Sequence, residues 1–344
     1  MSVPHCLHHF DAVWIWQAEA RSPAGDAAES LKRILGQQPA LSLDPVWGWI
    51  GPVSPPTGLL ELAHAVADPC WQQALAMQPL SDPDNPAAWP GLIMSVSKGD
   101  TGAWLSAADL SQAWARHGIP GCLSARLAAD WGQRFFRGAP PVGACASGLL
   151  AILEAARLVQ QGSCPWAIAG AADRSLQPLL LGGFRNLGVS CGAHLPAAHA
   201  GQATGFALAE GAAALALGPR PAAGTSPWRI CGGASLGDAS HETRCDDPQA
   251  LGRLLSILWE LCPQPEMIIC HGTGTAAGDA LESAALAAGP WRQIPRLCCK
   301  PIIGHSLGAN AAVELAIGLH GPWRSLWKLS LGFGGHLAGL ACQR

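Results

Sequence analysis

Short runs of apolar residues alternate along this chain with longer stretches that are rich in alanine and leucine. The runs whose length and apolar character predict buried strands are residues 91–96, 166–170, 267–270 and 296–299. The stretches whose length predicts helices are residues 149–160, 249–261 and 309–319. Since strands and helices alternate, the pattern favours an α/β fold with a mostly parallel sheet that is covered on both faces.

A stretch rich in proline and glycine, residues 218–224, interrupts this alternation. Such a composition is typical of a linker between two folded units. We therefore expect an N-terminal half over residues 1–218 and a C-terminal half over residues 219–344.

The composition allows a large buried core, because hydrophobic residues make up 49% of the 344 residues and charged residues only 13%. The net charge of −3 offers no basic surface to nucleic acid. The start of the chain lacks the basic and apolar regions of a signal peptide, and no run of about 18 apolar residues predicts a membrane span. We therefore expect a cytoplasmic protein that has no nucleic-acid partner and no membrane span.

The chain has 13 cysteines without a regular framework, and in a cytoplasmic protein most of them are expected to be small buried hydrophobes. The opening residues His5, Cys6, His8 and His9 could suggest a metal site. No partner ligands follow them with the spacing of a zinc finger, so the sequence predicts no metal site.

Residues 304–308, Gly-His-Ser-Leu-Gly, fit the G-x-S-x-G turn that presents a nucleophilic serine in α/β-hydrolases. That mechanism needs an acid and then a histidine later in the chain. No aspartate follows Ser306, and the one later glutamate, Glu314, lies in the helix that would begin at the serine. A second match, residues 233–237, has no oxyanion-loop motif before it. The serine hydrolase interpretation is therefore disfavoured.

A different nucleophile is suggested by residues 142–150, Val-Gly-Ala-Cys-Ala-Ser-Gly-Leu-Leu, which precede a predicted helix. Cys145 is expected at a strand-to-helix turn, where the positive end of the helix dipole lowers the pKa of a thiol. Small neighbours would leave its sulfur accessible. Taken alone, a cysteine among alanine and glycine can equally be a packing residue.

Two histidines occur in stretches that could hold an imidazole at a fixed angle. His271 opens a loop rich in glycine and threonine, residues 271–275, directly after a predicted strand. His305 follows Gly304 and lies five residues after Lys300, where another predicted strand ends. A lone histidine in such a loop can also be structural.

These stretches together resemble the β-ketoacyl-acyl-carrier-protein synthases of the thiolase superfamily. Members of that family carry a nucleophile segment close to ACASG, a first histidine in HGTGT and a second in K-x-x-x-G-H-x-x-G-A. In this sequence the three segments are residues 144–148, 271–275 and 300–309, in the same order. Residues 205–211, 238–243 and 332–335 resemble further segments of the family, and the similarity extends from about Ser22 to the C-terminus.

The resemblance implies a thiolase-like five-layer α-β-α-β-α fold made of two similar halves. It implies that Cys145 accepts an acyl group from the phosphopantetheine arm of an acyl carrier protein, and that no cofactor is bound. The N–H groups of Cys145 and Phe333 would hold the oxyanion. The residues that complete the implied site are His271 and His305 on the enolate, Lys300 and Glu314 as orienting groups, and Thr273 and Thr275 at the substrate.

The implied activity is decarboxylative condensation of an acyl thioester with malonyl-acyl-carrier-protein in fatty-acid, polyene or polyketide biosynthesis, by a homodimer or a heterodimer. Departures from the family leave alternatives open. Residues 199–204 replace the acidic and basic residues usual there, and His336 and Leu337 stand where an asparagine often follows the glycine loop. The chain could instead be a silent chain-length factor that partners an active synthase, or an acyltransferase that condenses nothing.

Overall fold

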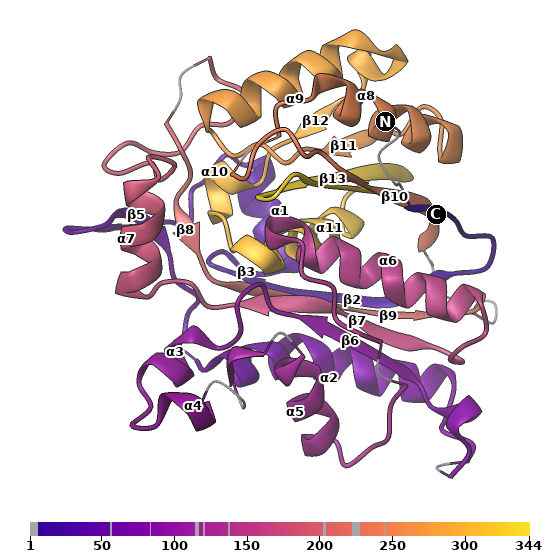
Figure 1. Ribbon diagram of the computed structural model, residues 1–344. Coiled ribbons are helices and arrows are strands. Elements are labelled where there is room, and N and C mark those ends of the chain that lie inside the picture. Colours follow the sequence, from indigo (N-terminus) through magenta and orange to yellow (C-terminus); the bar gives the residue numbers. More distant parts are fainter. Residues whose placement is uncertain are drawn as a thin grey trace.

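The computed structural model describes residues 6–55, 57–82, 84–113, 117–119, 121–136, 138–201, 204–221, 228–243 and 245–344. Five layers alternate between helices and strands, with α8 (Pro248–Leu261) and α9 (Ala276–Ala288) on one outside and α2 (Leu59–Met77) and α5 (Cys122–Asp130) on the other (Figure 1). Between the two strand layers lie α6 (Ser147–Gln160) and α11 (Asn310–Leu319). The predicted α-β-α-β-α arrangement is therefore confirmed.

Hydrogen bonds join the two strand layers of the described residues into one sheet. The N-terminal layer contains β6 (Gly91–Ser95), β7 (Ala167–Asp173), β9 (Gly211–Gly218) and β2 (Trp14–Ser22), with β3 (Gly25–Asp26) paired to β2. The C-terminal layer contains β10 (Trp228–Gly237), β14 (His336–Gln343), β13 (Ser325–Gly332), β11 (Met267–Ile269) and β12 (Arg296–Leu297), with β1 (Cys6–His9) paired to β10. The layers connect where Trp228 pairs with Ile15 and Arg229 with Trp14.

The prediction of a mostly parallel sheet is wrong. Among the described strands of this sheet, only β6 with β7, and β11 with β12 and β13, pair in parallel. The antiparallel pairs are formed by strands that the apolar pattern did not predict, chiefly β2, β9, β10 and β14. Apart from the hairpins of β2 with β3 and of β13 with β14, these pairs join strands that lie far apart in sequence, so local periodicity carries no information on the direction of pairing.

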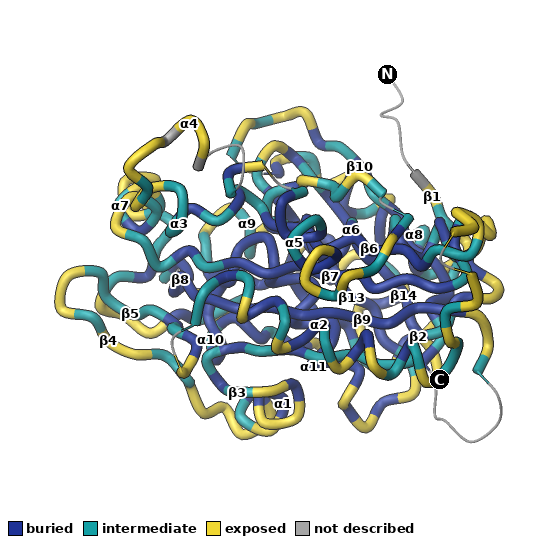
Figure 2. The backbone as a smooth tube through the Cα atoms, turned by 90° about the horizontal axis from the view of Figure 1, so that it is seen from below, coloured by how far each residue is buried: buried dark blue, intermediate teal, exposed yellow. Residues whose placement is uncertain are grey.

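All three predicted helices are confirmed, and the two central ones explain how the layers close. Every residue of α11 is buried, as expected for a helix that has a sheet on each side (Figure 2). A Cβ atom on Gly148 of α6 would lie 2.9 Å from the Cβ of Ala312 in α11. The two helices therefore approach each other closely only because this position has no side chain.

The smaller elements lie around this frame. They are α1 (Ala27–Leu35), α3 (Thr101–Leu105), α4 (Leu110–Ala113), α7 (Pro178–Asn186) and α10 (Lys300–Ile303), and a second sheet of β4 (Ser42–Asp44), β5 (Gly48–Gly51) and β8 (Leu208–Ala209). Except in α10 and β8, which are buried, exposed residues gather in these smaller elements and in loops, while the strand layers are buried (Figure 2). None of the helices that the structure describes is long and apolar enough to cross a membrane.

Two local expectations need correction. The strand predicted over residues 296–299 is β12, which ends at Leu297, and Lys300 begins α10 instead of ending a strand. The described residues from 138 to 143 contain no strand before Cys145. Pro140 and Pro141 explain this, since neither has an N–H group to donate to a sheet.

The predicted boundary after residue 218 falls between β9, which ends at Gly218, and β10, which begins at Trp228. The division into two halves stays a prediction, and β1 at the N-terminus lies in the C-terminal strand layer. Residues 222–224, the last three of the predicted linker, lie outside the described residues. So does His5 of the N-terminal cluster.

Candidate active site

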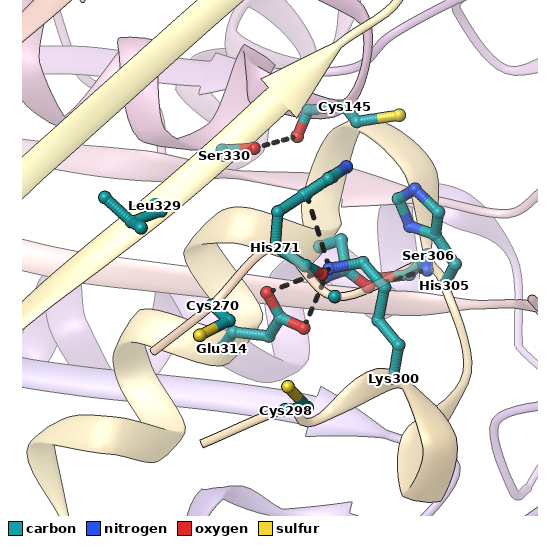
Figure 3. A network of polar contacts seen from close by, with 12 residues as sticks. Cys145, Cys270, His271, Cys298, Lys300, His305, Ser306, Glu314, Leu329 and Ser330 are labelled. Carbon is teal, nitrogen blue, oxygen red and sulfur yellow. Dashed lines mark hydrogen bonds and ion pairs between the residues drawn. The ribbon is translucent and has the colours of Figure 1, made fainter. Parts of the chain in front are cut away.

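A pocket of about 270 Å³ is lined by residues from both sides of the predicted boundary after residue 218. It brings together six of the residues that the sequence singled out: Cys145, His271, Thr273, Thr275, His305 and Phe333. The other two, Lys300 and Glu314, lie behind the pocket wall and contact each other. Residues more than 180 positions apart therefore converge on one cavity, as Figure 3 shows for the cysteine and both histidines.

Cys145 lies in a short 3-10 turn, Ala144–Ala146, directly before α6. Ala144 has a φ of 48°, in the region that residues with side chains rarely adopt, so the turn is strained at the residue before the cysteine. Ser147 braces the turn, because its hydroxyl accepts from the N–H of Gly143 and donates to the carbonyl of Ala144. Ser330 of β13 donates to the carbonyl of Cys145 at 3.1 Å.

The expected lowering of the Cys145 pKa is not found. Burial raises the pKa of this thiol to about 11, against the smaller lowering effects of Lys300, Lys98 and a hydrogen bond from the Phe333 backbone. The thiolate is disfavoured because the side chain is only 7% exposed and a charge there loses its water. The Phe333 contact does place that backbone N–H at the sulfur, where the sequence expected an oxyanion donor.

His305 is held as a neutral donor. Its Nδ1 accepts a hydrogen bond of 3.2 Å from the backbone N–H of Leu307, so the ring proton resides on Nε2. Burial, with Lys300 adding to it, keeps the pKa of His305 well below the usual range. The edge of the ring meets Phe206 at a centroid distance of 4.8 Å. A neutral imidazole with Nε2–H can donate one hydrogen bond into the pocket.

His271 is oriented in the same way by a cation. Lys300 Nζ lies 3.5 Å from His271 Nδ1, which must accept there, and it also donates to the His271 carbonyl. Burial and the charge of Lys300 hold the pKa of His271 well below the usual range. The two histidine rings stand almost perpendicular, with centroids 5.8 Å apart. Each ring therefore has its Nε2–H available in the same cavity.

A buried charge cluster supports these histidines from behind. Glu314 of α11 accepts from Lys300 Nζ at 3.1 Å and also pairs with Lys328 of β13. Lys328 donates further to the carbonyls of Cys270 and Leu329, at 3.1 and 2.7 Å. Sequence reasoning missed Lys328. The available signal was a lysine inside the apolar run 326–331, where a charge requires a buried partner.

The loop after β11 is held by two carboxylates. Glu282 of α9 accepts from the N–H groups of His271 and Gly272, at 2.6 and 2.7 Å. Asp279 accepts from the N–H of Gly274 at 3.0 Å, and the hydroxyls of Thr273 and Thr275 are 2.9 Å apart. The loop that carries His271 is thus fixed by hydrogen bonds, and Glu282 is its main support.

Ser306 has none of the geometry of a nucleophile. It does not line the pocket and is 3% exposed. Its hydroxyl lies 3.5 Å from Asn310 Oδ1, and Gly211 of β9 packs closely against it. Ser306 thus serves to pack the turn that carries His305.

Comparisons with known proteins agree with this site. The family model "Beta-ketoacyl synthase, N-terminal domain" matches residues 62–223, and "Beta-ketoacyl synthase, C-terminal domain" matches residues 262–319. The chain is 32% identical over 194 residues to 3-oxoacyl-[acyl-carrier-protein] synthase 2 of Coxiella burnetii, covering 51% of this chain and 47% of that protein. It is 28% identical over 244 residues to the highly reducing polyketide synthase sphB of Aspergillus fumigatus, covering 66% of this chain and 10% of that protein. The chain spans about half the length, or less, of the curated relatives it matches.

Solved structures share the fold at low identity. A beta-ketoacyl synthase from Burkholderia phymatum superposes with a TM-score of 0.79 at 19% identity, over 97% of this chain and 99% of that one. A type II polyketide ketosynthase, solved with its acyl-carrier protein and bound to a hexaketide, gives 0.80 at 18% identity, over 97% and 99%. The complex of the ketosynthase ApeO with its chain length factor ApeC from Xenorhabdus doucetiae contains a chain that gives 0.75 at 20% identity, over 96% and 98%.

Proposed function

Since this chain belongs to the β-ketoacyl synthase family, we propose that it condenses an acyl thioester with malonyl-acyl-carrier-protein, with loss of carbon dioxide. The observation that carries the proposal is the convergence of Cys145, His271 and His305 on one pocket, with both histidines neutral and protonated on Nε2. Transfer of an acyl group to a thiol would need only the cysteine among these three residues. Two extra neutral donors suit a reaction in which negative charge develops on a carbonyl oxygen.

In the first half of the reaction, Cys145 Sγ attacks the carbonyl carbon of the acyl thioester. The bond from that carbon to the pantetheine sulfur breaks, and the proton of the Cys145 thiol ends on the departing pantetheine thiol. The N–H of Phe333 lies at the sulfur and, with that of Cys145, would stabilise the oxyanion, each such donor contributing ~3 kcal/mol. The high pKa of Cys145 makes proton transfer to the leaving thiol part of this step.

In the second half, the malonyl group loses its carboxylate as carbon dioxide, and the electron pair of the broken C–C bond forms an enolate. The Nε2–H groups of His271 and His305 would donate to the enolate oxygen. The carbanion then attacks the acyl carbon on Cys145, and the bond to Sγ breaks with its electron pair on sulfur, which takes a proton from water to restore the thiol. Lys300 keeps His271 in the donor tautomer, and Glu314 holds Lys300 in place.

The partners follow from this proposal. The acyl and malonyl groups would arrive on the phosphopantetheine arm of an acyl carrier protein, the partner with which the structurally similar type II polyketide ketosynthase was solved. A homodimer or a heterodimer with a second ketosynthase-like chain is the proposed assembly, in fatty-acid, polyene or polyketide biosynthesis.

The experiment that tests the proposal separates its two halves. The purified chain is incubated with acyl-carrier-proteins of several chain lengths, and the acyl-enzyme is measured by intact mass. Release of carbon dioxide from malonyl-acyl-carrier-protein is measured separately. We expect both signals from the wild type. Cys145→Ala should form no acyl-enzyme and should keep only a residual decarboxylation that the two histidines support. A chain that shows neither signal is a chain-length factor, and one that acylates without decarboxylating malonyl is an acyltransferase only.

A further inference from the structure

Behind the loop that carries His271, three potential metal ligands from distant segments gather in one place. His199 comes from the loop between α7 and β8, Cys270 follows β11, and Cys298 follows β12. One imidazole nitrogen and both sulfur atoms lie within 4.8 Å of one another. Among the described residues this is the one such group of three, and the proposed condensation uses none of its members.

The imidazole of His199 is already oriented for a ligand. Its Nε2 lies 2.9 Å from Glu282 Oε2, and its Nδ1 faces Cys298 Sγ at 3.9 Å. A histidine whose outer nitrogen is held by a carboxylate while the inner nitrogen points at sulfur ligands is the usual arrangement around protein-bound zinc. Glu282 is itself buried and anchored by two backbone N–H groups, so this orientation is rigid.

We propose that His199 Nδ1, Cys270 Sγ and Cys298 Sγ bind a divalent cation of the zinc class, with water in the fourth position. Two sulfurs and an imidazole form a soft ligand set that selects zinc over magnesium or calcium. In a tetrahedral site with Zn–S near 2.3 Å and Zn–N near 2.1 Å, ligand atoms lie about 3.6 Å apart. The 3.9 Å between Cys298 Sγ and His199 Nδ1 is already close to that value.

The surroundings of the three ligands also bear on this proposal. Gly272 lies against Cys298, where an added Cβ would come within 3.0 Å of the sulfur, so the backbone can pass over the thiol only as glycine. On the other side, His199 lines a cavity of about 380 Å³ together with Thr275, Ala276 and Asp279. Of the three ligands, His199 alone lines this cavity, so open space reaches the site from the side of the imidazole.

A cation at this site would stabilise the loop that carries His271, because the site and the loop have residues in common. Cys270 directly precedes His271, and Glu282 bonds both His199 and the backbone of His271. The sequence prompted a metal interpretation only for the N-terminal cluster around His8, and it gave no sign of this group, because its three ligands come from segments that only folding brings together.

The test measures metal binding directly and needs no condensation activity. The full-length chain, freed of metal under reducing conditions, is titrated with Zn²⁺ in competition with a chromophoric chelator and, separately, with Co²⁺. We expect one Zn²⁺ per chain and a near-ultraviolet thiolate-to-cobalt absorption band. Cys298→Ser and His199→Ala should each weaken Zn²⁺ binding at least 100-fold, and Glu282→Gln by 10- to 100-fold.

The control is Cys299→Ser, which changes the neighbouring buried cysteine outside the cluster and should leave Zn²⁺ affinity unchanged. Circular dichroism of each variant verifies folding, and Glu282→Gln keeps the test valid if a ligand variant does not fold. Zinc binding that is absent from the wild type, or equal in the wild type and Cys298→Ser, overturns the proposal. So does a Cys270–Cys298 disulfide that persists under the reducing conditions.

Discussion

The cysteine and the histidines of the pocket are all kept uncharged by burial, and this has opposite consequences for their chemistry. A neutral imidazole with its proton on Nε2 is ready to donate, so burial prepares His271 and His305 for their proposed role. A neutral thiol is a poor nucleophile, so burial of Cys145 lowers its reactivity in the empty site. The site is thus built for stabilising negative charge, and its nucleophile becomes reactive only with a substrate that takes its proton.

The pH dependence of thiol alkylation tests this point. With a pKa of about 11, the rate at which iodoacetamide modifies Cys145 should rise tenfold per pH unit from pH 7 to pH 10 without a plateau. Cys245 also lines the pocket, but burial and nearby acidic groups raise its pKa to about 12, so it should react about tenfold more slowly. Peptide mapping by mass spectrometry gives both rates. A plateau near pH 8 would show that a thiolate exists in the free protein.

A second prediction concerns the neighbours His305 and Ser306. Ser306→Ala should reduce condensation at most tenfold, or ~1.4 kcal/mol of transition-state stabilisation, because the hydroxyl packs against Gly211 outside the pocket. His305→Ala should reduce malonyl decarboxylation by orders of magnitude, because the enolate loses a donor that His271 cannot replace. Acylation of Cys145 should persist in both variants. The reverse pattern, with decarboxylation lost only in Ser306→Ala, would reopen the serine hydrolase interpretation.

Helices and strands were predictable from the sequence where one face or a short apolar run dominates, as in α6, α8, α11 and β6. β9 was not, since half of Gly211–Gly218 is alanine and both its end residues are glycine, two residue types that are depleted in strands. It is a strand because it pairs with β2 on one side and β7 on the other, while α2 and α11 pack against it. Tertiary packing decided that element, and it also decided the antiparallel order of the sheet.

In the candidate site, too, local motifs predicted some features and the whole fold decided others. The motifs around Cys145, His271 and His305 predicted which residues meet, because each stands in a short segment with its own turn. Lys328 belongs to no motif, and its role depends on where β13 passes Glu314. The pKa of Cys145 was predicted with the wrong sign, since burial depends on the whole fold and the helix terminus is only one contribution.

The charge cluster between α10, α11 and β13 gives a stability prediction. Glu314→Gln should lower the free energy of unfolding by about 3–5 kcal/mol, because two buried lysines lose the charge that compensates them. The matched control is Glu154→Gln on α6, which removes a partly exposed pair with Arg157 and should cost less than about 1 kcal/mol. Urea unfolding followed by circular dichroism measures both. Equal effects of the two variants would mean that Glu314 does not hold the lysines in their charged form.

For the molecule as a whole, the position of the sheet edge suggests how two chains meet. β6 ends the order of the large sheet, and Phe136 and Pro141 contact it without forming a ladder. Phe136 exchanges backbone hydrogen bonds with this edge, and Ser95 of β6 donates to the Pro141 carbonyl at 2.7 Å. Val142, which follows, is 45% exposed although it is apolar and only three residues from Cys145. An assembly that covers this segment would also tie the nucleophile's turn to a partner.

We therefore predict a dimer, homo- or heteromeric, with residues 138–143 at its interface in place of the strand that was expected there. Val142→Asp should shift the molar mass in light scattering from dimer to monomer, because a charge would be buried without a partner. Leu179→Asp is the matched control: Leu179 is 64% exposed on α7, and the same change there should leave the dimer intact. The wild type is measured at micromolar concentrations, alone and co-expressed with a second ketosynthase-like chain. A monomer in both samples contradicts the prediction, and a dimer that survives Val142→Asp places the interface elsewhere.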